Sequence, residues 1–137
     1  MIKTIISLLE EPIEDGMTHP ADRYLRQRLN ENSNNLNELT SWYWDNKNAP
    51  YVSDVLRLIG RLEKNIIEKE GIKIMNDALK SSEVGIRESA VSALENWGGQ
   101  DAINILLDYV NSEKTKWLKN YANEVIKDLV NLSLTDK

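Results

Sequence analysis

An apolar stripe that recurs three times along the chain constrains the fold more than any other sequence feature. In residues 86–97 the stripe consists of Ile86, Ala90, Val91, Leu94 and Trp97. This spacing places the five side chains on one side of a helix with 3.6 residues per turn. Thirty-two residues later the matching positions are Leu118, Ala122, Ile126 and Leu129, and thirty-five residues earlier they are Tyr51, Val55, Leu56, Ile59 and Leu62. The repetition predicts helices that stack side by side, because one stripe cannot be buried alone.

Residues 86–97 also predict how this helix packs and where it ends. Ser89, Ala90 and Ala93 are small, so we expect a neighbouring helix to approach closely. Gly98 and Gly99 follow directly, and glycine adopts the positive φ of a helix C-cap without steric cost. We therefore expect the helix to end at Trp97.

Helical spacing extends over most of the chain, and no alternating apolar run is bounded by a hairpin turn. The sequence predicts an all-α protein of about eight helices in antiparallel pairs. The expected helices cover residues 3–10, 20–29, 36–45, 50–62, 72–79, 84–97, 100–110 and 115–131. Thr18-His19-Pro20 is typical of a helix start. For residues 63–71 the sequence is compatible with two structures, a separate turn or the start of a longer helix that reaches Leu79. Gly71 weakens a continuous helix, so the pattern does not decide between them. In residues 100–110 we expect Ile103, Leu106, Leu107 and Val110 to face inward.

The length of 137 residues suits a single domain, which we divide into three parts. Residues 1–35 form N-terminal capping helices, residues 36–131 form three helix pairs, and residues 132–137 form a frayed tail. Residues 1–9 lack the features of a signal peptide, and no apolar run is long enough to cross a membrane. The absence of cysteine fits a cytosolic protein and is also compatible with a secreted one; of the two, we expect a cytoplasmic protein.

Composition and motifs argue against an enzyme. The chain has no cysteine, so it has no Cys-based zinc site, and its single histidine, His19, belongs to no HExxH-type spacing. No Ser-His-Asp or Cys-His arrangement can be assembled around it. The chain also lacks a glycine-rich phosphate loop, and we expect no cofactor. The 22 acidic and 17 basic residues give a net charge of −5. This charge argues against nucleic acid as the main partner and is compatible with a basic protein.

Two local features suggest a contact surface. Trp42 and Trp44 are two residues apart and therefore about 200° apart around a helix, so they cannot both be buried in one layer. Glu10, Glu11, Glu14 and Asp15 form an acidic cluster that is either a solvated loop or a contact for a cationic partner.

Residues 75–98 resemble a HEAT-like repeat, with a first helix ending in Ala78-Leu79, a short polar turn, and a second helix bearing Val84, Arg87, Ala90 and Leu94. Residues 102–129 are similar, with Lys119 in the place of Arg87. The resemblance is clearest over residues 72–131, and its period of 32 to 35 residues is shorter than the usual period of about 40. It implies a right-handed α-solenoid whose second helices, 50–62, 84–97 and 115–130, line a binding face. Arg87 has a second interpretation, in which it binds carbonyl groups of a turn.

Together these features predict a non-enzymatic module that binds a protein, most specifically an immunity protein that neutralises a bacterial toxin with a basic domain. The alternatives are a HEAT-like scaffold or adaptor and, with less support, a nucleic-acid-binding protein related to the HEAT-like DNA glycosylases. No membrane partner is expected. The candidate contact residues are Trp42, Trp44, Asp54, Arg57, Arg61, Arg87, Glu88, Glu95, Lys119, Asn120 and Asn123.

Overall fold

The computed structural model describes residues 1–135, and all regular secondary structure within this range is α-helical. The helices are α1 (Ile2–Leu8), α2 (Pro20–Glu31), α3 (Asn35–Asp45), α4 (Val52–Gly60), α5 (Lys64–Ala78), α6 (Val84–Trp97), α7 (Gly99–Val110) and α8 (Lys116–Thr135). None of residues 1–135 lies in a β-strand, so the predicted all-α class is confirmed. No helix in this range is long and apolar enough to cross a lipid bilayer.

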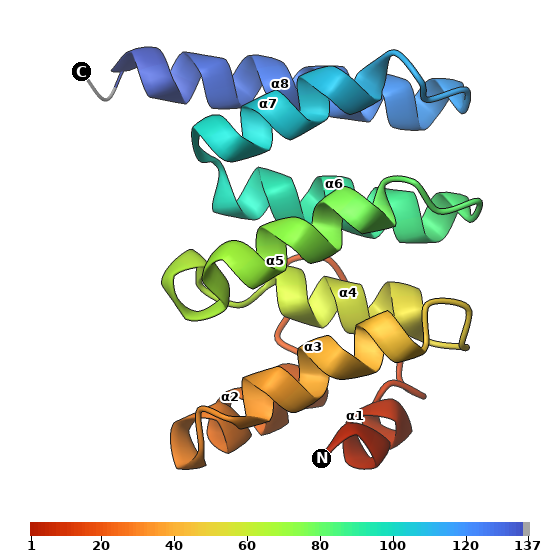
Figure 1. The fold of residues 1–137 in the computed structure, drawn as a ribbon, viewed down its shortest axis with the longest axis vertical. Helices are drawn as coiled ribbons and strands as arrows, with labels where there is room; N and C mark the ends of the chain where they lie inside the picture. Colours follow the sequence, from red (N-terminus) through yellow and green to blue (C-terminus); the bar gives the residue numbers. More distant parts are fainter. Residues whose placement is uncertain (136–137) are drawn as a thin grey trace.

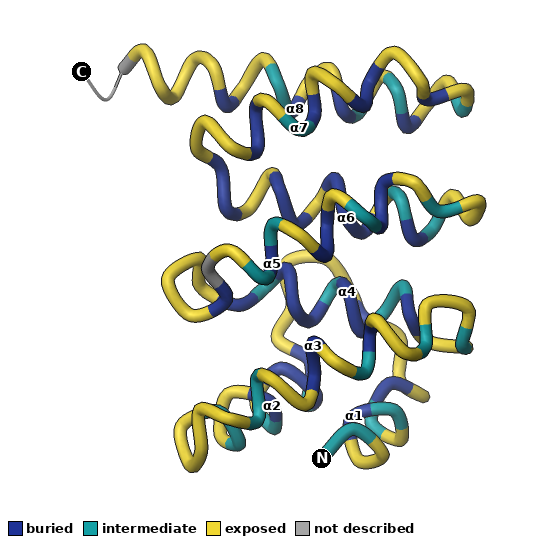
Figure 2. Tube along the Cα trace, in the orientation of Figure 1, coloured by how far each residue is buried: buried dark blue, intermediate teal, exposed yellow. Residues whose placement is uncertain are grey.

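The helices form two layers along the length of the molecule (Figure 1). In the first layer α3 contacts α5 and α5 contacts α7, and in the second layer α4 contacts α6 and α6 contacts α8. The pairs α5–α6 and α7–α8 pack together across short turns, and α1 and α2 pack with α3 at the N-terminal end. Figure 2 shows that the buried side of each helix faces its neighbours, which gives a core that continues from one end to the other.

Helix α6 has the predicted stripe and the predicted end. All five stripe residues are buried: Ile86, Ala90, Val91, Leu94 and Trp97. Gly98 and Gly99 adopt φ values of 61° and 86°, in the region that glycine enters without steric cost. The helix therefore stops at Trp97 and α7 starts after a sharp turn, as the sequence predicts.

Helices α4 and α6 approach closely, as the small residues of α6 predict. A Cβ atom added to Gly60 would lie only 2.6 Å from the Cβ atom of Ala93. The hydroxyl oxygens of Ser53 and Ser89 are 2.9 Å apart. The Asn96 side chain donates to the carbonyl oxygen of Gly60 at 2.8 Å. Apolar contact and polar pairing therefore hold the two helices in one register.

The segment that the sequence left open is helical. Helix α5 starts at Lys64 and passes through Gly71 without a break. A Cβ atom on Gly71 would lie 2.9 Å from the Trp97 ring and 2.5 Å from Ile67. Gly71 therefore costs α5 some intrinsic helix stability but makes room for the Trp97 ring.

Four details of the predicted helices are wrong. Tyr51 is exposed and precedes α4 in a left-handed conformation (φ 70°), so it does not belong to the buried stripe. Leu107 is exposed, because the buried side of α7 runs through Leu106 and Tyr109 instead. Ile126 is only half-buried, and Val125 takes the inward position. The predicted frayed tail is helical as far as Thr135, and residues 136–137 lie outside the described range.

The connection between α1 and α2 crosses the surface of the second layer. We call residues 9–19 the strap. It passes over α4 on the side turned away from the first layer (Figure 1). Ile13 is buried, whereas Glu14, Asp15 and Met17 are exposed. The surface of α4, α6 and α8 turned away from the first layer is the second-layer face, and the strap covers part of it.

Candidate functional site

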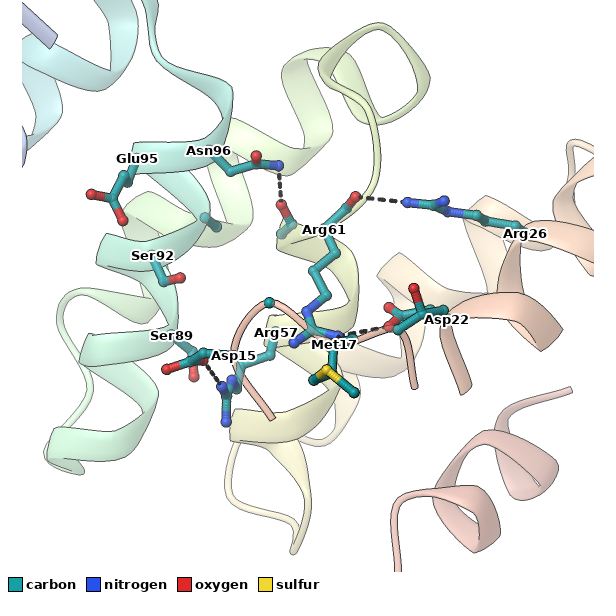
Figure 3. A pocket seen from close by; sticks show the side chains of 14 residues that line it. Asp15, Met17, Asp22, Arg26, Arg57, Arg61, Ser89, Ser92, Glu95 and Asn96 are labelled. Atoms are coloured by element: carbon teal, nitrogen blue, oxygen red, sulfur yellow. Dashed lines mark hydrogen bonds and ion pairs between the residues drawn. The ribbon is translucent and has the colours of Figure 1, made fainter. Parts of the chain in front are cut away.

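Two hollows lie side by side on the second-layer face. The first has a volume of about 590 Å³ and lies between the strap, the N-terminal end of α2, α4 and α6; Figure 3 shows its lining. The second has a volume of about 470 Å³ and lies between the strap, α4, α6 and α8. Asp15, Arg57, Ser89 and Ser92 line both hollows. The strap residue Asp15 therefore stands between two recesses of one continuous surface.

Arg61 fixes the strap over the first hollow. Its Nη1 atom donates to Asp22 at 2.7 Å and to the carbonyl oxygen of Met17 at 3.0 Å, and its Nη2 atom donates to the carbonyl oxygen of Glu14 at 2.9 Å. Asp22 is buried, so the ion pair is shielded from water on one side. Figure 3 shows the Arg61 side chain reaching from α4 toward Asp22 and Met17.

Arg57 pairs with the strap as well. Its Nη2 atom lies 2.5 Å from the Asp15 carboxylate, which is itself exposed. Arg57 and Arg61, two of the candidate contact residues, are therefore both ion-paired in this structure. Both side chains hold the strap, and their charges are offset by Asp15 and Asp22. Helical periodicity predicts which side of α4 they occupy but cannot show that another segment covers that side.

His19 closes the C-terminal end of the strap. Its Nδ1 atom accepts the backbone N–H of Ala21 at 3.0 Å, so the ring proton is on Nε2, which donates to the carbonyl oxygen of Glu11 at 2.8 Å. Asp22 completes a capping box by accepting the backbone N–H of His19. The single histidine therefore caps α2 and ties together the two ends of the strap.

The second hollow has aromatic and acidic walls. Trp117 and Tyr121 of α8 line it opposite Ser53 and Arg57 of α4, and Glu88 lines it from α6. Trp117 is 51% exposed. The Tyr121 hydroxyl donates to Glu95 at 2.8 Å, and burial, followed by the hydrogen bond to Glu95, raises the pKa of Tyr121. Tyr121 therefore stays neutral and holds α8 against α6 beside the hollow.

Arg87 belongs to a separate, structural cluster. Its guanidinium donates to both oxygens of Glu113 at 2.7 and 3.1 Å and to the carbonyl oxygen of Ser81 at 3.0 Å. Tyr109 donates a short hydrogen bond to the same carboxylate. Arg87 thus joins its own preceding turn to the next one, which favours the structural interpretation of this residue over the partner-binding one.

The remaining candidate residues are dispersed. Trp42 and Trp44 lie on α3 in the first layer, where Trp42 is half-buried and Trp44 is exposed. The Trp44 indole donates to Glu70 at 3.1 Å. Asp54 and Lys119 are half-buried on α4 and α8, whereas Asn120 and Asn123 are exposed on α8. Of the eleven candidates, those that line the hollows are Arg57, Arg61, Glu88 and Glu95.

Sequence reasoning did not include Trp117, Tyr121, Met17 or Ser92 in the candidate site. Trp117 and Tyr121 have a readable signal. They are four residues apart, immediately precede the buried Leu118 and Ala122, and so form one row on the flank of α8. Met17 has no such signal, because its position depends on the path of the strap.

Among the side chains that the structure describes, no group of three or more acidic or histidine residues is arranged to hold a metal ion. The chain matches no protein-family model, and searches of curated proteins and of solved structures give no significant match. The geometry and charge of the second-layer face are therefore the observations that bear on function.

Proposed function

We propose that this protein is a non-enzymatic binding module whose second-layer face binds a cationic segment of another protein. The observation that carries the proposal is the charge balance of this face. Of the arginines that line the hollows, Arg57 and Arg61 are already paired with carboxylates, and Arg26 donates to the carbonyl oxygen of Arg61. Glu88 is exposed and has no ion-pair partner within the described residues. The exposed Trp117 and Met17 add apolar contact area beside these charges.

The architecture we propose is a short-period, HEAT-like right-handed solenoid. The successive contacts of α4, α6 and α8 in one layer and of α3, α5 and α7 in the other support this architecture. A row of stacked second helices offers an extended surface for another chain. The proposed binding face lies on this row, with the strap as part of its surface.

The most specific form of the proposal is an immunity protein that neutralises a basic bacterial toxin. The net charge of −5 and the exposed acidic residues of the strap, Glu10, Glu11, Glu14 and Asp15, support a basic partner. A free-standing adaptor uses the same face and differs only in its partner. Co-expression with a toxin encoded beside this chain separates the two: protection of growth supports immunity, and no protection supports an adaptor.

Nucleic acid is the disfavoured partner. A cationic groove needs unpaired arginines, but Arg57, Arg61 and Arg87 are paired with Asp15, Asp22 and Glu113. We expect no binding of labelled DNA or RNA at low salt. If the protein bound DNA or RNA with micromolar affinity that fell steeply with salt, nucleic acid would replace a cationic protein as the proposed partner.

The decisive experiment compares two charge reversals on opposite layers. Glu88→Lys changes the second-layer face, and Glu38→Lys changes an exposed position of α3 in the first layer. A partner captured from the native host is purified, and its affinity for each variant is measured by calorimetry. Glu88→Lys should weaken binding about tenfold or more while leaving the melting temperature unchanged, because it places like charges opposite each other. Equal affinities for both variants would move the binding site away from the second-layer face.

A further inference from the structure

The hollow between α6 and α8 combines the features that recognise a planar cation. Trp117 presents an exposed indole, and Tyr121 presents a neutral phenol held by Glu95. Glu88 contributes a carboxylate on the opposite helix. The volume of about 470 Å³ exceeds that of a single side chain and leaves the recess open to an incoming residue.

The charges around this hollow favour a cation over an anion. Arg57 also lines it, but its guanidinium is paired with Asp15, so this pair adds no net charge. Glu95 accepts a hydrogen bond from the uncharged Tyr121 and keeps its own charge beside the hollow. No ion pair within residues 1–135 involves Glu88 or Glu95. The recess is therefore net negative on its α6 side.

The chemistry of the walls favours arginine over lysine. A guanidinium is flat, stacks on an indole ring, and donates several hydrogen bonds in one plane. Ser92 also lines the hollow and offers a hydroxyl acceptor in addition to the Glu88 carboxylate. The ammonium group of lysine is a compact point charge, so it lacks the flat face and the planar set of donors that a guanidinium offers to this recess.

We propose that this hollow receives an arginine side chain of the protein partner, with the guanidinium stacked on Trp117 and paired with Glu88. The inference rests on the proposed function and specifies the anchor residue of the partner. Arginine is one of the residue types that dominate binding energy at protein interfaces. Its guanidinium stacks on aromatic rings, and Trp117 offers such a ring in the wall of this hollow.

The test uses blocked pentapeptides that differ only at the central residue: Gly-Gly-Arg-Gly-Gly and its citrulline and lysine analogues. Citrulline keeps the shape of the arginine side chain and removes its charge. Binding is followed by the indole N–H signals of the four tryptophans in a ¹⁵N-labelled sample, with the Trp117 signal assigned from Trp117→Phe. We expect the arginine peptide to shift the Trp117 signal saturably, the lysine peptide to bind more weakly, and the citrulline peptide to have no effect.

Two further variants test the ion pair. Glu88→Gln should lower the affinity for the arginine peptide about tenfold, which is the effect of losing one charge-assisted hydrogen bond. Glu38→Gln, on the exposed side of α3, should leave the affinity unchanged. Equal binding of arginine and citrulline peptides, an unchanged affinity of Glu88→Gln, or a shift confined to Trp44 would overturn the inference.

The experiment separates this inference from the proposed function. If Glu88→Lys weakens the full partner but the arginine peptide fails to shift Trp117, the binding face stands and the arginine anchor is rejected. If neither the partner nor the peptide responds to changes at Glu88, the proposed face is rejected together with its anchor.

Discussion

At the scale of single residues, Glu113 links more of the structure than any other carboxylate described. Its side chain is only 2% exposed and accepts hydrogen bonds from Arg87, Tyr109 and the backbone N–H of Thr115. Burial by itself raises the pKa of Glu113, but the hydrogen bonds from Arg87, Tyr109 and Thr115 outweigh it and lower the pKa to about 2. Glu113 is therefore an anion that the fold stabilises, and its stabilisation depends on pH.

The first prediction concerns this pH dependence. The pKa of Glu113 is lower in the folded state than in the unfolded state, so the unfolded chain binds more protons between these values. The contribution of Glu113 is fully present above its unfolded pKa of about 4.5 and is lost as the pH falls toward about 2. Over this window we expect the wild type to lose up to about 3 kcal/mol more unfolding free energy than Glu113→Gln, as measured by urea denaturation.

The control for that prediction is Glu38→Gln, whose side chain is exposed. This variant should follow the wild-type pH profile. At neutral pH Glu113→Gln itself should lose about 3 kcal/mol, because Arg87 remains partly buried without its partner. Parallel profiles of the wild type and Glu113→Gln would show that Glu113 does not carry the acid sensitivity.

The second prediction contrasts two glycines at the α4–α6 contact. Gly60→Ala should destabilise the protein by about 1–3 kcal/mol, because the new Cβ atom collides with Ala93 across the two helices. Gly85→Ala meets only the Ser53 hydroxyl at 3.6 Å, an ordinary contact, so it should stabilise α6 by up to about 1 kcal/mol. Denaturant unfolding of both variants measures the difference. Equal effects of the two substitutions would mean that α4 and α6 can move apart at Gly60 without a loss of unfolding free energy.

At the scale of elements, the strap decides which charges of the second-layer face are available. It has no regular structure, and its position depends on bonds to α4 and on the cap of α2. The side chain of Arg61 bonds to the strap at Glu14 and Met17 and also to the following helix, α2, at Asp22. Residues 14–18 of the strap are exposed and held mainly by these bonds, so they open more readily than the helices beneath them.

The third prediction is that Arg61→Ala releases the strap locally. Backbone amides of residues 13–19 should exchange with deuterium about tenfold faster or more, because the Arg61 bonds to Glu14, Met17 and Asp22 are lost. The amides of α6 should stay protected. Arg23→Ala serves as the matched control, because Arg23 is an exposed arginine of α2. Faster exchange throughout the molecule would mean that Arg61 supports the whole fold rather than the strap.

At the scale of the whole molecule, the continuous core makes α6 the central element. Helix α6 contacts α4, α5, α7 and α8, so it joins the N-terminal and C-terminal halves. Leu94 is fully buried at this junction, whereas Ile126 occupies the equivalent position of α8 and is only half-buried. Equivalent positions of α6 and α8 should therefore contribute differently to the free energy of unfolding, because α6 is packed on both sides within its layer and α8 lies at the end.

The fourth prediction follows from that difference. Leu94→Ala should cost about 2–5 kcal/mol of unfolding free energy, as expected for a fully buried leucine. Ile126→Ala should cost clearly less, about 1–2 kcal/mol, because part of the side chain already contacts water. Circular dichroism and tryptophan fluorescence should report one coincident transition for each variant. Separate transitions would show that the two halves unfold independently.

The sequence by itself determined the helical class, the buried stripe of α6, the end of α6 at Trp97 and the start of α2 at Pro20. Each of these depends on residues within a few helical turns, so periodicity and capping preferences are enough to predict them. Only the tertiary structure decided the roles of Arg57, Arg61 and Trp117. Arg61 meets Asp22 across 39 positions in sequence, and Trp117 lines a hollow with Ser53. Such pairings depend on the path of the strap and on the register of stacked helices, which no local pattern encodes.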